Sequence, residues 1–272
     1  MRIKKLAIGV TFHYVEDRIK YLEKIATQFP LLADEVLIHI FTNENDVDKS
    51  LNIMNAVKQG RELTVEIHTP TYLGHPYLLT WSHFYTFRKL FDADQSITHF
   101  MYVEDDIFIT PKNIEYWLRG LEDLKSEGLI PSFLRYEKME GSTELYSTDS
   151  FTRSIFHKLP RMKASENYCY VNLPEPYQGM YLLDRELMYE HLNGPSSIPE
   201  KTPWHIREKA AAGLTFVNVP RGCVSRNFIG YDSKNKKIDP NSLIHHIPNN
   251  YVANPDIALG KIKINELIIH VG

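Results

Sequence analysis

The amino-acid sequence predicts an α/β fold with a mostly parallel central sheet and helices on both of its faces. Strand-like and helix-like segments alternate over the first hundred residues, which is the pattern of parallel βαβ units. The chain has 272 residues, enough for one large domain or two small ones. Its residues are 43% hydrophobic and 24% charged, which is ordinary for a globular protein and disfavours disorder.

The first hundred residues are expected to form four strands separated by three helices. The strands are short runs of apolar or β-branched residues, expected at 6–12, 35–42, 63–68 and 98–103. The helices carry apolar residues at helical spacing and are expected at 16–29, 47–57 and 78–91. Pro30 ends the first of these helices. This order of elements predicts an open sheet covered by helices.

The second half has weaker periodic signals. A helix should begin at Thr110-Pro111, because Thr is a good N-cap and Pro fits the first helical turn. The stretch 138–163 is polar and loop-like, and the tail after 227 has few regular signals until 261–271. The other expected elements are a strand at 177–183 and helices at 184–192 and 202–213. We find no repeat and no linker, so one domain is expected over 1–272.

Charge and missing motifs exclude several classes of protein. The chain has 31 Lys and Arg against 34 Asp and Glu, so a general nucleic-acid surface is disfavoured. It lacks the Gly-rich dinucleotide fingerprint, the P-loop, the G-x-S-x-G elbow and the H-E-x-x-H zinc helix. Cys169 and Cys223 form neither a disulfide framework nor a paired-cysteine metal site, which fits a reducing compartment.

Hydropathy predicts a cytoplasmic protein. A membrane span needs about 20 mostly apolar residues, and the apolar runs of this sequence are much shorter. The basic N-terminus is not followed by the apolar segment and cleavage pattern of a signal peptide. Peripheral contact with a membrane stays open.

The most informative motif is an apolar strand that runs directly into three carboxylates, Glu104-Asp105-Asp106. Ligands of open α/β sheets bind beyond the carboxyl ends of strands, where these groups fall. Alternation along the strand would point Glu104 and Asp106 one way and Asp105 the other. Because clustered carboxylates repel one another, a hard divalent cation with oxygen ligands is expected, Mn²⁺ or Mg²⁺. The alternative is a solvated acidic turn that caps the next helix.

The chain resembles glycosyltransferases of the GT-A (nucleotide-diphospho-sugar transferase) fold. The first half of that fold is a Rossmann-like nucleotide-binding unit. The resemblance rests on the strand ending at Thr11, on Arg18 after it, and above all on Glu104-Asp105-Asp106, which is similar to the family's D-x-D motif. It implies that Asp106 binds the metal on the donor diphosphate and that Asp105 contacts the ribose. Glu104, in place of the usual first Asp, would contact the metal or the nucleotide.

On the same resemblance, Thr11 and Arg18 would lie on the donor side. A solvated helix charge is an equal alternative for Arg18. Tyr177-Gln178-Gly179 resembles the glycine-containing strand that lines the sugar and acceptor, although an ordinary strand with a bulge at Gly179 is as well supported.

The resemblance also places a catalytic base and further metal ligands in the second half. Glu208 would take the proton of the acceptor hydroxyl, with Asp184 and Glu186 as rivals. A surface glutamate in a helix that also carries Lys209 is the alternative for Glu208. Trp204, four residues before Glu208, shares a helix face with it and would pave the acceptor site or belong to the core. His245 and His246 offer one further metal ligand, or else form a hydrogen-bonded loop pair.

The sequence therefore predicts a metal-dependent glycosyltransferase that moves a sugar from a nucleotide-sugar, a UDP-sugar, to a hydroxyl acceptor with inversion. The setting implied by the resemblance is glycan or surface-polysaccharide biosynthesis. Residues 1–106 would bind the nucleotide-sugar and 107–272 the acceptor. A nucleotidyltransferase that forms nucleotide-sugars is disfavoured, because no Gly-rich basic loop follows the first strand. A non-catalytic carbohydrate-binding protein on the same fold stays open.

Overall fold

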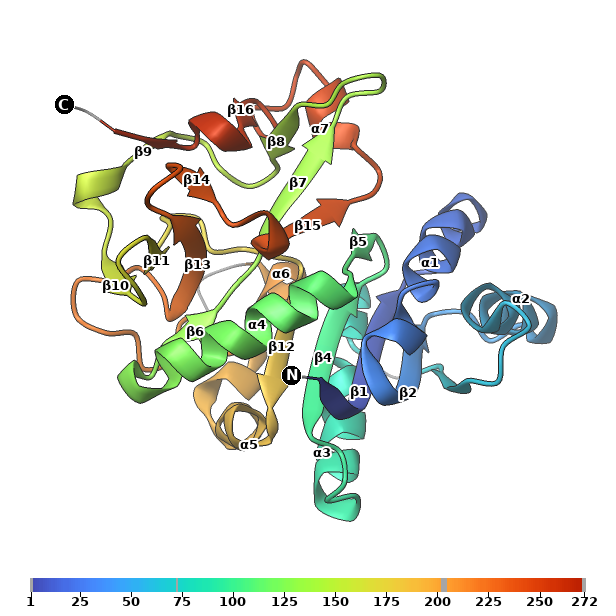
Figure 1. The fold of residues 1–272 in the computed structure, drawn as a ribbon. Helices are drawn as coiled ribbons and strands as arrows, with labels where there is room; N and C mark the ends of the chain where they lie inside the picture. Colours follow the sequence, from blue (N-terminus) through green and yellow to red (C-terminus); the bar gives the residue numbers. More distant parts are fainter. Residues whose placement is uncertain (1, 72, 202–204, 271–272) are drawn as a thin grey trace. The chain divides into compact units, whose positions relative to one another are not determined.

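The computed structural model describes residues 2–71, 73–201 and 205–270, which form two compact units (Figure 1). Unit I consists of Arg2–Pro111 and Gly179–Leu214. Unit II consists of Lys112–Gln178 and the chain from Thr215 onward. Unit I therefore combines the first hundred residues with one segment from the second half of the sequence.

Unit I is built around a five-stranded sheet in the order β12-β4-β1-β2-β3. The strands are β1 (Ile3–Phe12), β2 (Ala33–Thr42), β3 (Thr64–His68), β4 (His99–Glu104) and β12 (Met180–Asp184). The first four are parallel, and β12 runs antiparallel to β4. The predicted α/β fold with a mostly parallel central sheet is thus confirmed. A short strand, β5 (Ile107–Phe108), follows β4.

Three helices of unit I connect its parallel strands, and two follow β12. They are α1 (Ile19–Ala26), α2 (Val47–Lys58), α3 (His83–Ala93), α5 (Arg185–Asn193) and α6 (Ile206–Lys209). Helix α3 packs closely against β1 at Gly9, where an added Cβ would lie 2.9 Å from Cζ of Phe87. A glycine in the middle of this buried strand therefore lets the helix approach the sheet.

Two expected helices of unit I begin or end with 3₁₀ turns. The segment expected as one helix at 16–29 is η1 (Glu16–Arg18), α1 and η2 (Phe29–Leu31), with Pro30 inside η2. Similarly, the helix expected at 78–91 begins only at His83, after η3 (Pro76–Trp81). The spacing of apolar residues does not separate a 3₁₀ turn from an α-helical turn, and 3₁₀ turns are frequent at helix ends.

The strand expected at 177–183 begins three residues later, at Met180. Gly179 has a φ of +65°, a left-handed conformation that an extended strand does not contain. Its carbonyl still accepts a hydrogen bond from the backbone N–H of Glu104 (3.1 Å), so the β4–β12 pairing reaches this residue. The glycine is required here by its backbone conformation.

Unit II begins with helix α4 (Pro111–Leu124), whose first residue, Pro111, is assigned to unit I. The rest of unit II consists mainly of short strands. One sheet has the order β10-β11-β13-β14, with β6 paired to β13, and another contains β16-β8-β7-β15. The strands are β6 (Ile130–Pro131), β7 (Leu134–Lys138), β8 (Leu145–Ser147), β9 (Ser154–Ile155), β10 (Arg161–Lys163), β11 (Tyr168–Val171), β13 (Asn227–Asp232), β14 (Lys237–Ile238), β15 (Leu243–His246), β16 (Ile262–Lys263) and β17 (Ile268–Ile269). A one-turn helix, α7 (Asn250–Ala253), follows β15.

Two expectations for unit II are wrong. The stretch 138–163, expected as a loop, contains β8, β9 and β10, and the tail between 227 and 261 contains β13, β14 and β15. These strands have two to six residues, too few for an alternating pattern to stand out from the sequence. Apolar residues of β13, such as Ile229 and Tyr231, still form one core with Val171 of β11, Ile238 of β14 and Ile268 of β17.

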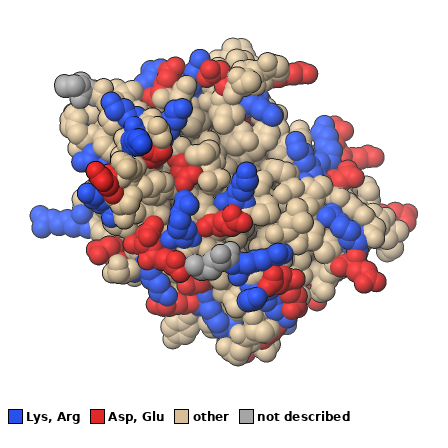
Figure 2. Space-filling model, viewed as in Figure 1, with Lys and Arg blue, Asp and Glu red and all other residues tan. Residues whose placement is uncertain are grey.

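The surface carries both signs of charge. Figure 2 shows Lys and Arg side chains interspersed with Asp and Glu over the face in view, in keeping with the net charge of −3. Among the described residues, we find no helix that is both long enough and apolar enough to cross a lipid bilayer.

Candidate functional site

Three acids, one at the end of β4 and two in the turn after it, lie at the carboxyl end of the parallel sheet of unit I. We call Glu104, Asp105 and Asp106 the strand-end carboxylates. Glu104 is the last residue of β4 and is the register partner of Thr11 on β1. Asp105 and Asp106 form the turn that follows, and each is only 7% exposed. In open α/β sheets this edge is where ligands bind.

Arg18 joins two of the strand-end carboxylates. It lies in η1, directly after β1. Its Nε and Nη2 donate to the two carboxylate oxygens of Asp105, at 2.9 and 2.5 Å, and Nη2 also donates to Oδ2 of Asp106 at 2.9 Å. This forked contact is the geometry that makes Arg–carboxylate pairs strong and directional. Arg18 is therefore not a simple solvated helix charge.

The expected alternation of the acids is wrong. The sequence placed Asp105 on the opposite side from Asp106, whereas one guanidinium contacts both. The strand ends at Glu104, so the side chains beyond it follow the geometry of a turn. Strand periodicity does not extend past the last paired residue.

Burial makes Asp105 costly to ionise. Burial and the charge of Asp106 raise the pKa of Asp105 to about 7, although its hydrogen bond to Arg18 acts in the opposite direction. Burial alone would lower the pKa of Arg18, but the hydrogen bond and charge of Asp105 outweigh it and the pKa is raised. Three carboxyl groups thus lie at this edge, and Arg18 contacts two of them. Carboxylate oxygens are the ligands that Mg²⁺ and Mn²⁺ prefer, so these residue types fit such a cation.

A layer of aromatic rings packs around Tyr102, near the end of β4. The ring of Tyr102 stacks on His83 of α3 (centroids 4.3 Å apart) and lies 5.7 Å from Tyr181 of β12. All three residues are buried. Burial raises the pKa of both tyrosines and lowers the pKa of His83 to about 3, so the layer is uncharged at neutral pH. It fixes β4 between its neighbours and is packing, not a second charged site.

Glu208, the expected base, lies in α6. Its Oε1 accepts hydrogen bonds from Nη2 (2.8 Å) and Nε (3.2 Å) of Arg207, and its side chain is 28% exposed. Trp81 Nε1 donates to the carbonyl of Ile206 (2.8 Å) and so holds the start of the helix. Trp204, like Thr202 and Pro203, lies outside the described residues. The helix ends at Lys209, before the expected end at Gly213.

The rival base Asp184 lies at the other end of the sheet. Since β12 is antiparallel to β4, Met180 pairs with Val103 near the strand-end carboxylates, whereas Asp184 pairs with His99. Its Oδ1 accepts from the N–H of Leu187 (2.8 Å) and caps α5, which carries Glu186 in its first turn. Asp184 is therefore a helix cap far along the strand from the acids.

Two of the expected acceptor residues belong to unit II. Gln178 is buried, and its Oε1 accepts from the N–H of Phe133 at 2.8 Å. The ring of Tyr177 lies under the guanidinium of Arg135 (4.6 Å), which also makes a forked ion pair with Asp149. Gly179 belongs to unit I. A role of Tyr177, Gln178 and Gly179 toward an acceptor stays a prediction.

His245 and His246 also lie in unit II, on β15. His246 Nδ1 is 2.6 Å from Oε1 of the buried Glu137, and His245 Nε2 is 3.0 Å from Oδ1 of Asn249. The two imidazoles have different partners, as expected for neighbours on a strand. Metal binding by either stays a prediction.

The structure thus brings Thr11, Arg18, Glu104, Asp105 and Asp106 together at one edge. Sequence reasoning missed that Arg18 pairs with both aspartates, because nothing local marks a contact between η1 and the turn after β4.

Comparisons with known proteins give matches of structure only. No family model matches the chain, and no curated protein sequence matches it. Among solved structures it is similar to a crystal structure of S. aureus TarS, with a TM-score of 0.43 and 15% identity. That match covers 77% of this chain and 34% of TarS. A crystal structure of S. aureus TarS 1-349 gives a TM-score of 0.42 and 14% identity, and the match covers 77% of this chain and 56% of that one. The matched part thus spans about a third of the first TarS chain and a little over half of the second. The likeness concerns the fold.

Proposed function

We propose that this chain is a metal-dependent glycosyltransferase of the GT-A type, which transfers a sugar from a UDP-sugar to a hydroxyl acceptor. The observation that carries the proposal is the group of strand-end carboxylates held by Arg18 at the carboxyl edge of a parallel sheet. The setting that we propose is glycan or surface-polysaccharide biosynthesis in the cytoplasm.

Each residue of the edge has a distinct part in this proposal. Asp106 and Glu104 would hold Mn²⁺ or Mg²⁺, as the resemblance to the D-x-D motif implies, while Arg18 engages both oxygens of Asp105 and one of Asp106. The ion, when bound, would stabilise the charge that develops on the leaving diphosphate. Asp105 would accept a hydrogen bond from the ribose, and Thr11 would line the donor side. Arg18 keeps both aspartates in place for these contacts.

Glu208 would accept the proton of the acceptor hydroxyl in a single displacement with inversion. Its ion pair with Arg207 orients the carboxylate, and a general base must be held in place in this way. An inverting reaction requires one such base and no covalent sugar–enzyme intermediate. The anomeric configuration of the product, read by NMR, would test this part separately.

The function itself is tested with the purified full chain and a panel of nucleotide-sugars, with Mn²⁺ and with Mn²⁺ removed by EDTA. We expect UDP to bind only with the metal, and one UDP-sugar to be hydrolysed or transferred. Sugar binding that ignores both EDTA and the strand-end carboxylates would instead indicate a carbohydrate-binding protein. Pyrophosphate release from a nucleoside triphosphate would indicate a nucleotidyltransferase.

The variant Glu208→Gln should bind UDP and Mn²⁺ normally but lose transfer by about 100-fold or more, which is the usual contribution of a general base. Transfer kinetics and calorimetric UDP binding measure the two effects separately. Glu200→Gln, at an exposed residue of η7 (Pro199–Lys201), is the matched control and should leave both unchanged. Normal transfer by Glu208→Gln would move the base to another residue.

A further inference from the structure

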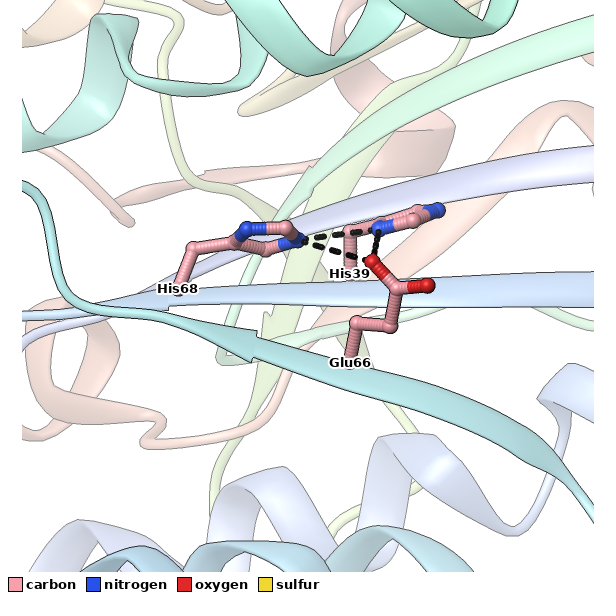
Figure 3. Close-up of side chains that lie close together, drawn as sticks. All are labelled: His39, Glu66 and His68. Carbon is pink, nitrogen blue, oxygen red and sulfur yellow. Dashed lines mark hydrogen bonds and ion pairs between the residues drawn. The ribbon is translucent and has the colours of Figure 1, made fainter.

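Two histidines and a glutamate meet at the free edge of the sheet of unit I. His39 lies on β2, and Glu66 and His68 lie on β3, the last strand of the sheet. The parallel register pairs His39 with Glu66, and Phe41 with His68. Side chains at paired and at alternate positions share one face, so all three project to the same side of the sheet. Figure 3 shows their nitrogen and oxygen atoms pointing toward a common point.

The distances between the three facing atoms match one face of a tetrahedral metal site. Nδ1 of His39 lies 3.0 Å from Nε2 of His68. Oε2 of Glu66 lies 3.5 Å from the first nitrogen and 3.7 Å from the second. Around Zn²⁺, with bonds of about 2.0–2.1 Å, tetrahedral ligand atoms are about 3.4 Å apart. The group therefore needs only small adjustments to hold such an ion.

Both rings are held in place and are uncharged. His68 stacks on Phe41, with centroids 4.8 Å apart, and His39 is 4% exposed. Burial lowers the pKa of His39 to about 4 and also lowers the pKa of His68, so both are neutral at pH 7. Neutral imidazole is the form that binds metals. Glu66 is well exposed, which leaves an approach from solvent.

The group is separate from the strand-end carboxylates. Glu104, Thr11, Phe41 and His68 follow one another in register across β4, β1, β2 and β3. Three strand spacings separate the two ends of this row, about 14 Å. The ligand chemistry also differs, because imidazole nitrogens favour Zn²⁺ and similar ions, whereas oxygen-only ligands favour Mg²⁺ and Mn²⁺.

We propose that His39, Glu66 and His68 form a zinc-type metal site with three protein ligands and one open position, which links the edge strand β3 to β2. This set of two histidines and one glutamate leaves room for a water or a small ligand. Within the described residues, Nε2 of His39 is buried without a hydrogen-bond partner. In tight zinc sites the imidazole nitrogen that does not contact the metal usually donates a hydrogen bond, and loss of that hydrogen bond weakens metal binding by about 10–100-fold. We therefore expect reversible binding of moderate affinity.

The test uses the tag-free full chain, stripped with a chelator and titrated with ZnCl₂ by calorimetry. CoCl₂ serves as a second probe, because tetrahedral Co²⁺ has a strong visible absorption. The wild type should bind one Zn²⁺ at this site, and excess Mg²⁺ should not displace it. His68→Gln and Glu66→Gln should each weaken binding by at least about tenfold and lose the Co²⁺ signal.

Two further variants make the test specific. His157→Gln removes an exposed imidazole in unit II, and Asp106→Asn alters the strand-end carboxylates; both should bind Zn²⁺ as the wild type does. Circular dichroism of each metal-free variant checks that it is folded. Unchanged Zn²⁺ binding by folded His68→Gln would mean that the histidines are a hydrogen-bonded pair only. Loss of binding in Asp106→Asn would place the ion at the acids, and either result overturns the proposal.

Discussion

Replacing Asp106 with asparagine should abolish metal-dependent UDP binding and lower the rate of transfer by about 1,000-fold. Asparagine keeps the shape of the side chain, which is 7% exposed, but removes the negative charge that we assign to the cation. A bound metal supplies several kcal/mol of transition-state stabilisation, and each 1.36 kcal/mol is a tenfold change in rate. Transfer kinetics at saturating Mn²⁺ and calorimetry with UDP measure the two losses.

Two companion variants identify the source of this effect. Asp48→Asn changes an exposed aspartate in the first turn of α2 and should have wild-type activity. Asp105→Asn should retain Mn²⁺ but bind UDP more weakly, since we assign Asp105 to the ribose. If Asp106→Asn binds UDP with Mn²⁺ as tightly as the wild type, the metal assignment is wrong.

The first hundred residues are predictable because their signals are local. The inner parallel strands are runs of apolar residues buried on both faces, as in β1, where the neighbours Ala7 and Ile8 are both fully buried. Each run is followed by a helical pattern, and βαβ connectivity then leaves few arrangements. The acids after β4 are visible for the same reason, because they directly follow such a run.

What the sequence did not reveal depends on contacts between distant segments. The fork from Arg18 to Asp105 requires the turn after β4 to face η1, and the meeting of His39 with His68 requires one particular register of β2 and β3. Neither condition follows from local spacing. The two-residue strands of unit II, such as β9, are too short to have a periodic pattern and are defined only by their partners.

Arg18→Met should destabilise unit I by about 3 kcal/mol at pH 8. Methionine has a similar length but no charge, so the variant leaves two nearly buried carboxylates without the guanidinium that they contact. Removing one partner of a buried ion pair costs about 3–5 kcal/mol, and we take the low end because the Arg18 side chain is 34% exposed. Urea unfolding of the full chain measures the change.

The destabilisation caused by Arg18→Met should be smaller at acidic pH. Because the pKa of Asp105 is raised to about 7 in the folded chain, from an ordinary 3.8, the folded state binds this proton more tightly than the unfolded state. The stability from this group is therefore complete below about pH 4 and is lost as the pH rises through 7. Arg18 lowers this pKa, so without it the loss extends to still higher pH. At pH 5 Asp105 is protonated in both proteins, so only the contact of Arg18 with Asp106 still contributes, and the difference should be smaller than at pH 8.

A matched control and a rescue separate this ion pair from a general effect of losing an arginine. Arg153→Met removes a half-exposed pair with Glu266 and should change stability little at either pH, because ion pairs in contact with solvent contribute little. Arg18→Met combined with Asp105→Asn should recover part of the loss, because the double variant no longer buries an unpaired charge at that position. Equal stability of Arg18→Met and the wild type at pH 8, or a larger loss at pH 5 than at pH 8, would show that Arg18 does not hold the strand-end carboxylates. Their role as a preformed cation site would then have to rest on other residues of the edge.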